Sequence, residues 1–415
     1  MGLCKRRCHG ESIPQRIISI NVLESDIKNR RIANHFRNFE RTIAAYRPVE
    51  PFSRFLTRFY KQNRQMGSSD RRMNSRYCYN FFRLGHGFDN LQPLERLCVA
   101  EFLCETDSLL IGDLKPEWDG RINEDLSEKL AFIESQFGPF VDQLFPSSVA
   151  LSTGINRLSF IYSHFIQPDL FIRVKRGHEA SVERALAGIN LSFRKEDEQT
   201  FALPNGSKLQ EIQKLAGLFE VQDRSSQRSL DGLQVGAGES WWDCCAASGG
   251  KSLLLLDRYP VSDLLVSDSR LSILRNLDAR FEQANVSLPY RKKILDLSQP
   301  VAHLMQNDAF DGIILDAPCT GSGTWGRTPE MLTQFNPSIL TSFNTLQRDI
   351  ARHVVPYLKS GGTLVYITCS VFLEENEAVA DFIEKELGLM SVTRQVIAGY
   401  SQRADTMFVA QFKKP

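Results

Sequence analysis

The first third of the chain has hydrophobic positions at the spacing of α-helices. Phe52, Phe55 and Phe59 recur three or four residues apart, and basic side chains occupy the other faces of the same turns. This period is typical of amphipathic helices that bury one stripe, so we interpret the phenylalanines as core rather than as rings exposed to stack on bases. The pattern predicts helices from about Ile17 to Phe140.

Local signals refine the first half of the chain. Ser68 or Ser69 is the predicted N-cap of a helix that runs through Arg83, and Pro146 with the polar residues after it ends the helical region. A short module follows, with predicted strands at Leu170–Val174 and Thr200–Leu203 and a predicted helix at Glu179–Ala187. We expect a small α/β unit there.

From Val221 onward, short apolar runs alternate with helical patterns. Strands are predicted at Ser240–Cys244, Asp263–Val266, Asp311–Leu315 and Thr363–Thr368, and helices at Leu271–Ala284, Ile339–Leu358 and Glu375–Glu386. This alternation predicts a parallel sheet with helices on both faces. Ligands of such sheets bind beyond the carboxyl ends of the strands.

Length and composition agree with several globular domains. The chain has 415 residues, of which 42% are hydrophobic and 24% charged. We expect three parts: a helical domain over residues 1–150, a small α/β module over 151–222 and an α/β domain over 223–415. No apolar run reaches the roughly 18 residues that cross a membrane, and the N-terminal residues lack a secretory pattern. We therefore expect no membrane partner.

Charge is distributed unevenly along the chain. The net charge is +1, yet residues 1–90 contain 18 Lys and Arg against 7 Asp and Glu. Such an excess indicates a part of the molecule that meets polyanions, although on charge alone a solvated helical surface explains it equally well.

The cysteine pattern indicates a reducing compartment. There are nine cysteines, an odd number, and no secretory pattern precedes them, so we expect no disulfide framework and a cytoplasmic location. Cys4, Cys8 and His9 lie close together but have no second cluster of ligands, so we expect no metal site.

A strand, a turn of small residues and a helix are predicted over Trp241–Ser252. The small residues allow a ligand to approach the backbone, and the helix start offers free amides. A phosphate-binding P-loop would need a glycine where Cys245 stands, so we exclude that reading. An acidic residue about 20 positions on, which would pair with ribose hydroxyls, is present as Asp268. Asp296 follows a third predicted strand and could reach an adenine amino group.

Two cysteines follow predicted strands of the same sheet. The segment IILDAPCTGSG delivers Asp316 and Cys319 to the end of one strand, and LVYITCS delivers Cys369 to the end of another. A thiolate that adds to carbon 6 of cytosine makes carbon 5 nucleophilic towards a sulfonium methyl group, which is covalent catalysis. Two thiols, a carboxyl group and a nucleoside site are the groups that this chemistry needs.

These motifs closely resemble the Sun/Fmu-type (RsmB-like) RNA (cytosine-5) methyltransferases, which depend on S-adenosylmethionine. The resemblance is strong over about 170 residues, from Trp242 to Lys413, and implies a Rossmann-like class I methyltransferase domain. In that family a CAAPGGK loop holds the methionine and ribose of the cofactor. It corresponds here to Cys245, Ala246, Ala247, Ser248, Gly249, Gly250 and Lys251, with Ser248 in the place of the family's proline.

The same resemblance implies roles for the residues that end the other strands. Asp268 would contact the ribose hydroxyls, Asp296 the adenine, and Asp316 would lie between cofactor and base. Cys369, in the TCS motif, corresponds to the nucleophile, and Cys319, in the DAPC motif, to the cysteine that assists release of the product.

The N-terminal part more faintly resembles the helical, NusB-like RNA-binding extension of the bacterial 16S rRNA enzymes, through GSSDRR and RYCYNFFRLG. We therefore expect an enzyme that methylates carbon 5 of an unpaired cytosine in RNA, with ribosomal RNA as the favoured substrate. The alternatives are a tRNA cytosine-5 methyltransferase, a DNA cytosine-5 methyltransferase with Cys319 as nucleophile, and a non-catalytic RNA-binding factor in ribosome assembly.

Overall fold

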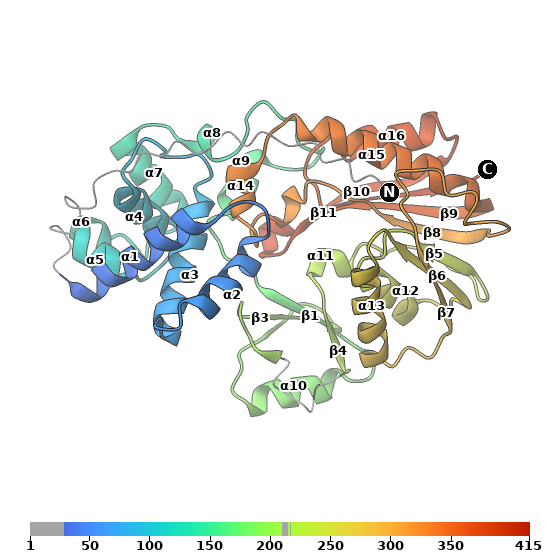
Figure 1. Ribbon diagram of the computed structural model, residues 1–415, viewed down its shortest axis with the longest axis horizontal. Helices are drawn as coiled ribbons and strands as arrows, with labels where there is room; N and C mark the ends of the chain where they lie inside the picture. The colour runs from blue at the N-terminus through green and yellow to red at the C-terminus, as the bar shows by residue number, and fades with distance from the viewer. Residues whose placement is uncertain (1–28, 210–214, 216) are drawn as a thin grey trace.

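The computed structural model describes residues 29–209, 215 and 217–415. The predicted helical pattern before residue 29, together with Cys4, Cys8 and His9, lies outside these residues. The described chain forms, in order, a group of helices, a small four-stranded sheet and a larger seven-stranded sheet (Figure 1).

The N-terminal helices pack around an aromatic core. They are α1 (Arg30–Ala45), α2 (Phe52–Gln62), α3 (Ser68–Arg83), α4 (Pro93–Cys104), α5 (Leu109–Leu114), α6 (Pro116–Asp119), α7 (Leu126–Phe137), α8 (Val141–Leu144) and α9 (Arg157–Ser163). Phe52, Phe55 and Phe59 are buried, and the ring centroids of successive pairs are 5.8 and 5.5 Å apart. Their interpretation as core residues is confirmed.

The start of α3 corrects one expectation. The helix begins at Ser68, but its N-cap is Gly67, so the prediction of a serine cap is wrong. The carboxylate of Asp70, in the first turn, accepts a hydrogen bond of 3.2 Å from the Gly67 backbone N–H. This contact fixes the entry of the chain into the helix from within the first turn, and no serine side chain caps it.

The small sheet is antiparallel, with strand order β2-β3-β1-β4. Its strands are β1 (Leu170–Val174), β2 (Arg194–Lys195), β3 (Thr200–Leu203) and β4 (Phe219–Val221), and α10 (Glu179–Gly188) follows β1. The predictions for β1, α10 and β3 are confirmed. The two shorter strands were not predicted, because two or three residues carry no measurable alternation.

The large sheet has the strand order β10-β11-β9-β8-β5-β6-β7. Its strands are β5 (Ser240–Asp243), β6 (Asp263–Asp268), β7 (Tyr290–Ile294), β8 (Phe310–Asp316), β9 (Leu358–Thr368), β10 (Met390–Ala398) and β11 (Thr406–Lys413). The first five, which include the four predicted strands, are parallel, so the predicted parallel sheet is confirmed, and β11 adds an antiparallel pairing with both β9 and β10. The short connection from β10 to β11 permits only an antiparallel return, since a parallel crossover needs a dozen residues or more.

Helices cover both faces of the large sheet (Figure 1). These helices are α12 (Gly250–Arg258) and α13 (Leu271–Gln283) on one face, and α15 (Ile339–Val354) and α16 (Glu377–Lys385) on the other. Alternate residues of a strand point to opposite faces. Trp242 and Tyr366 therefore pack under α15 and α16, whereas Trp241 and Val365 pack under α12 and α13.

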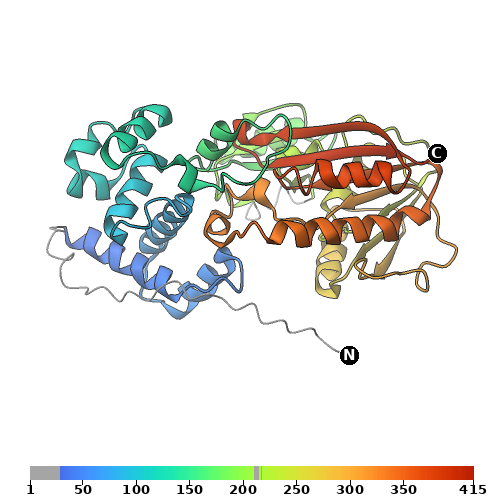
Figure 2. The same cartoon turned by 90° about the horizontal axis from the view of Figure 1, so that it is seen from above.

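The helical part and the segments that follow strands of the large sheet share a hydrophobic core at the junction between the two parts (Figure 2). Phe372, three residues after Cys369, stacks on Phe145 and on Phe335, with ring centroids 5.8 and 5.0 Å apart. Backbone hydrogen bonds join the same places: Ser152 N–H donates to the Val371 carbonyl (2.9 Å), and Leu373 N–H donates to the Ala150 carbonyl (3.1 Å).

Candidate active site

The two cysteines lie beside each other beyond neighbouring parallel strands. Asp316 ends β8 and pairs with Ile367 of β9, so the loops that follow these strands leave the same edge of the sheet. The Sγ atoms of Cys319 and Cys369 are 3.4 Å apart, and both side chains are partly exposed. The structure therefore brings together the two thiols that the sequence pattern selects.

A glycine allows the two cysteine loops to approach this closely. Gly323 N–H donates to the carbonyl of Cys369 at 2.9 Å. A Cβ atom at Gly323 would lie 2.0 Å from the Thr406 carbonyl oxygen and 3.0 Å from that of Cys369. Both neighbours are backbone atoms, so no side chain fits there without moving β11 or the loop after β9.

An ion pair between a buried lysine and a partly exposed aspartate stands beside the thiols. Lys251 Nζ lies 3.0 Å from Asp316 Oδ2 and also donates to Ser226 Oγ at 2.9 Å. Burial lowers the pKa of Lys251, but the Asp316 carboxylate raises it further, so the pKa stays above its ordinary value and the amine stays charged. The same amine interacts electrostatically with Cys369.

The two thiols have different surroundings. The pKa of Cys319 is raised well above its ordinary value by its contact with Cys369, by burial and by the negative charge of Glu375. Cys319 is therefore held as a neutral thiol.

The loop after β5 closes over the amino end of α12. Ala246 N–H donates to the Ser267 carbonyl at 2.9 Å, which fixes the turn against β6. Gly249 has a φ of 82°, and a Cβ atom there would lie 2.6 Å from Cε1 of Phe281. The position therefore requires glycine for its backbone angle and for its packing.

Ser248, which stands where the resembled family has proline, is held by a side chain from α13. The Arg280 guanidinium donates to Ser248 Oγ at 3.1 Å and pairs with Glu220 of β4 at 2.9 Å. The loop is therefore fixed by a hydrogen bond across the fold rather than by a proline ring. Arg280 and Glu220 were missed in the sequence, because nothing local links them to the loop.

Asp268 and Asp296 lie at the same edge of the sheet but in different environments. Asp268 ends β6, is buried, and accepts hydrogen bonds from the backbone N–H and the guanidinium of Arg270 at 2.9 and 3.0 Å. Asp296 follows β7, is exposed, and accepts from the Ser298 hydroxyl at 2.6 Å. The Asp268 carboxylate is therefore already oriented by Arg270, whereas that of Asp296 is held by a hydroxyl of its own turn.

A cavity of about 300 Å³ joins several of these groups. Its lining includes Gln222, Asp223, Lys251, Asp316, Cys369 and Asp405. The carboxylates of Asp223 and Asp405 had not been predicted. They arrive from segments 182 residues apart, and Arg327 pairs with both at 2.8 Å.

The ion pairs of Arg327 with Asp223 and Asp405 affect the charge state of Asp405 and the placement of Arg327. Burial and the charge of Asp223 raise the pKa of Asp405. Arg327 is held between the carboxylates of Asp223 and Asp405.

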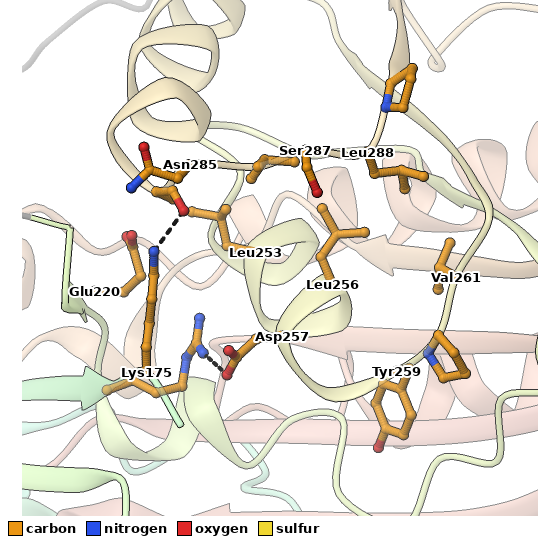
Figure 3. Close-up of a pocket in the computed structure, with 15 residues that line it drawn as sticks. Lys175, Glu220, Leu253, Leu256, Asp257, Tyr259, Val261, Asn285, Ser287 and Leu288 are labelled. Carbon is orange, nitrogen blue, oxygen red and sulfur yellow. Dashed lines mark hydrogen bonds and ion pairs between the residues drawn. The ribbon is translucent and has the colours of Figure 1, made fainter. Parts of the chain in front are cut away.

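A larger cavity of about 600 Å³ lies away from the cysteines, between the small sheet and the helices α12 and α13 (Figure 3). Lys175 Nζ donates to the Ala284 carbonyl across it at 2.6 Å, and Asp257 pairs with Arg173. Lys175, Asp257, Arg173 and Glu220 thus all have partners within the protein, and none of the predicted site residues lines this cavity. We take the smaller cavity as the candidate active site.

Asp243, which ends β5 beneath the loop, carries a testable pH effect. Burial raises its pKa to about 7, although the Ser252 hydroxyl donates to it at 2.6 Å. The folded protein thus binds this proton more tightly than the unfolded chain does, where the pKa is about 4. The protonated Asp243 therefore increases the free energy of unfolding. This stabilisation is fully present below about pH 4 and is lost as the pH rises to about 7.

We expect Asp243→Asn to remove this dependence. The free energy of unfolding of the variant, relative to the parent, should rise between pH 4 and pH 7 by up to about 4 kcal/mol. Urea denaturation at several pH values measures it, with Asp113→Asn, an exposed carboxyl on α5, as the control. A relative stability that does not change with pH contradicts the assignment.

Among the described residues, no three His, Cys, Asp or Glu side chains form a group that could hold a metal ion. The helices of the same residues include none that is long and apolar enough to cross a membrane.

Comparison with known proteins adds an independent finding. Residues 232–412 match the family model "16S rRNA methyltransferase RsmB/F". The chain is 31% identical over 222 residues to the ribosomal RNA small subunit methyltransferase B of Vibrio cholerae, which covers 52% of this chain and 50% of that protein. It is 33% identical over 240 residues to the protein of the same name from Proteus mirabilis, with 54% of each chain covered. The chain spans about half the length of these curated relatives.

The solved structure of PH0851 covers 88% of this chain and 95% of its own, with a TM-score of 0.67 and 18% identity. This likeness concerns the fold. It confirms the expected Rossmann-like α/β architecture preceded by a helical part. The matched residues 232–412 include the loop after β5 and both cysteine loops.

Proposed function

We propose, from the premise that residues 232–412 belong to the 16S rRNA methyltransferase RsmB/F family, that this chain is an S-adenosylmethionine-dependent RNA cytosine-5 methyltransferase. The observation that carries the proposal is the 3.4 Å approach of the Cys319 and Cys369 sulfurs beside the Lys251–Asp316 pair. Each group has a task in adding a thiolate to a pyrimidine and removing it again.

In the first step Cys369 attacks carbon 6 of the cytosine. The sulfur–carbon bond forms from the thiolate electron pair, and the ring's 5,6 double-bond electrons move towards carbon 5 and nitrogen 3. Lys251 pairs with Asp316 at 3.0 Å in the same cavity, and we assign to Asp316 a hydrogen bond to the ring. S-adenosylmethionine, when bound, supplies the electrophilic methyl group that carbon 5 takes.

Release reverses the addition. The proton on carbon 5 passes to a water molecule, the electrons of that carbon–hydrogen bond form the 5,6 double bond again, and the carbon–sulfur bond breaks with its electron pair returning to Cys369. Cys319 is in contact with the leaving sulfur and is held as a thiol. We therefore assign Cys319 to the release of the product, as the thiol that contacts the departing Cys369 sulfur.

The residues that would hold the cofactor fit a nucleoside with a charged amino acid tail. The loop Cys245–Lys251 presents backbone amides at the start of α12, a site that favours negative groups. Asp268 and Asp296 present carboxylates at the ends of the next two strands, where hydroxyl and amino donors can be met.

The helical part supplies a basic surface. Its exposed cations between residues 30 and 64 are Arg30, Arg31, Arg37, Arg41, Arg47, Arg54, Arg58, Lys61 and Arg64. The acidic residues of the same stretch are Glu40 and Glu50. Phosphate contacts of this kind give affinity without sequence preference. We propose that residues 1–150 bind RNA, that 151–222 form a connecting module, and that 223–415 carry the chemistry.

The substrate class follows from these features and from the relatives. We propose small-subunit ribosomal RNA as the substrate, methylated in the cytoplasm. The target cytosine must be unpaired or flipped, because a base inside a helix cannot meet a thiolate in a loop.

The purified chain, labelled S-adenosylmethionine and unmodified small-subunit ribosomal RNA test the proposal directly. We expect label in 5-methylcytosine, identified by mass spectrometry of the nucleosides, and no label in transfer RNA. Transfer to tRNA alone would overturn the substrate. Absence of both transfer and cofactor binding by calorimetry would favour a non-catalytic RNA-binding factor and overturn the enzyme.

Replacing the arginine that holds Ser248 tests the cofactor loop. We expect Arg280→Ala to weaken binding of S-adenosylmethionine about tenfold. Without the guanidinium, Ser248 of the loop loses its hydrogen bond to α13 and, through it, the link to Glu220. Calorimetry measures the affinity, and Arg275→Ala, an exposed arginine on the same helix, is the control. Equal affinities for the parent and Arg280→Ala would contradict the role of the loop.

A further inference from the structure

A buried carboxylate joins the two cysteine loops. Glu375 lies between β9 and α16 and is fully buried. Its carboxylate accepts hydrogen bonds from the Thr320 backbone N–H at 2.8 Å, from the Thr320 hydroxyl at 2.6 Å and from the Ser370 hydroxyl. Thr320 and Ser370 are the residues that directly follow Cys319 and Cys369. The Glu375 side chain therefore holds each loop at the residue that directly follows its cysteine.

Every recorded hydrogen-bond donor to this carboxylate is neutral. Besides Thr320 and Ser370, the Gln347 amide donates to it at 3.4 Å and to the Pro318 carbonyl at 3.0 Å, which adds a third contact to the Cys319 loop. Burial raises the pKa of Glu375, while the hydrogen bonds from Ser370 and Thr320 oppose that rise. Its charge acts on Cys319 and disfavours a second negative charge there.

The charges that act on the two thiols are thus of opposite sign. Lys251 acts on Cys369, and Glu375 acts on Cys319. Two groups of the same chemistry, 3.4 Å apart, are made unequal by the residues around them.

We propose that Glu375 is a positioning residue that decides which thiol reacts: through Thr320 and Ser370 it holds the two loops together, and through its charge it keeps Cys319 neutral so that Cys369 is the nucleophile. The inference rests on the proposed function for its purpose. It concerns the reactivity of two side chains, however, and can be measured without RNA or cofactor.

The test is alkylation of the two thiols by iodoacetamide, resolved by peptide mass spectrometry between pH 6 and pH 10. In this reaction the thiolate displaces iodide, so the rate reports the ionised fraction. We expect the parent protein to be alkylated at Cys369 at least about tenfold faster than at Cys319 at pH 8. In Glu375→Gln, which preserves the size of the side chain, we expect Cys319 to react about tenfold faster than in the parent.

Glu374→Gln is the matched control, because Glu374 is the neighbouring, partly exposed carboxylate. It should leave both rates unchanged. An unchanged Cys319 rate in a folded Glu375→Gln protein would overturn the electrostatic role. If Glu375→Gln does not fold, the comparison within the parent still decides, since equal rates for the two thiols, or a faster Cys319, would overturn the inference.

The outcome separates this inference from the proposed function. A parent protein that methylates RNA but alkylates both thiols equally retains the function and loses the role of Glu375. A protein with unequal thiols and no methyl transfer retains the role of Glu375 and loses the function. In the active case, Glu375→Gln should lower kcat and leave the KM for S-adenosylmethionine unchanged, because Glu375 is absent from the residues that line the smaller cavity.

Discussion

A Cys369→Ala protein is expected to transfer no detectable methyl group from S-adenosylmethionine to RNA, a loss of at least about a thousandfold. In the proposed mechanism Cys369 supplies the electron pair that makes carbon 5 reactive, and its sulfur lies 3.4 Å from that of Cys319 in the cavity that Lys251 also lines. Transfer of tritium from labelled cofactor into acid-precipitable RNA measures the loss.

The control for this experiment is Cys104→Ala, which removes a thiol of the helical part. It should retain the activity of the parent. Calorimetric binding of S-adenosylmethionine by Cys369→Ala shows that the cofactor site is intact. Normal turnover by Cys369→Ala would remove it from the role of nucleophile.

Replacing the other cysteine should have the opposite effect on the covalent intermediate. We expect Cys319→Ala to accumulate a protein–RNA adduct that survives denaturing electrophoresis, in a large fraction of the protein, because addition through Cys369 proceeds while release is impaired. The adduct appears as a slow-migrating band that contains labelled RNA.

The double variant, Cys319→Ala with Cys369→Ala, is the control and should form no adduct. The same experiment distinguishes a DNA-type enzyme, in which Cys319 would be the nucleophile. An adduct that forms in Cys369→Ala and not in Cys319→Ala would exchange the two roles. Product formation at the parent rate by Cys319→Ala, without an adduct, would exclude it from release.

Local patterns in the sequence predicted the strands that carry the chemistry. Apolar runs ending in Asp316 and Thr368 have enough length to identify strands, and parallel strands end at one edge of a sheet. The sequence did not give the order of the strands. That β8 and β9 are neighbours, and that the two thiols therefore meet, is a property of the fold.

Residues that depend on distant partners could not be predicted. Asp223 and Asp405 share Arg327, and Ser248 depends on Arg280, over separations of 32 to 182 residues. No local period or motif records such contacts. Glu375 stood in an acidic run that is typical of an exposed helix start, and only its burial against Thr320 and Ser370 distinguishes it from its neighbours.

The hydrogen bonds of residues 150–152 to the segment after Cys369, and the stacking of Phe372 on Phe145, have a consequence for how the molecule can be divided. A cut that removed everything before the small sheet would strip Phe372 of Phe145 and leave the Val371 carbonyl without its donor. The reactive thiol is three residues from that aromatic ring. We therefore expect the α/β part to need residues 145–152 for its stability, so a version of it joined to a different N-terminal part should retain this segment.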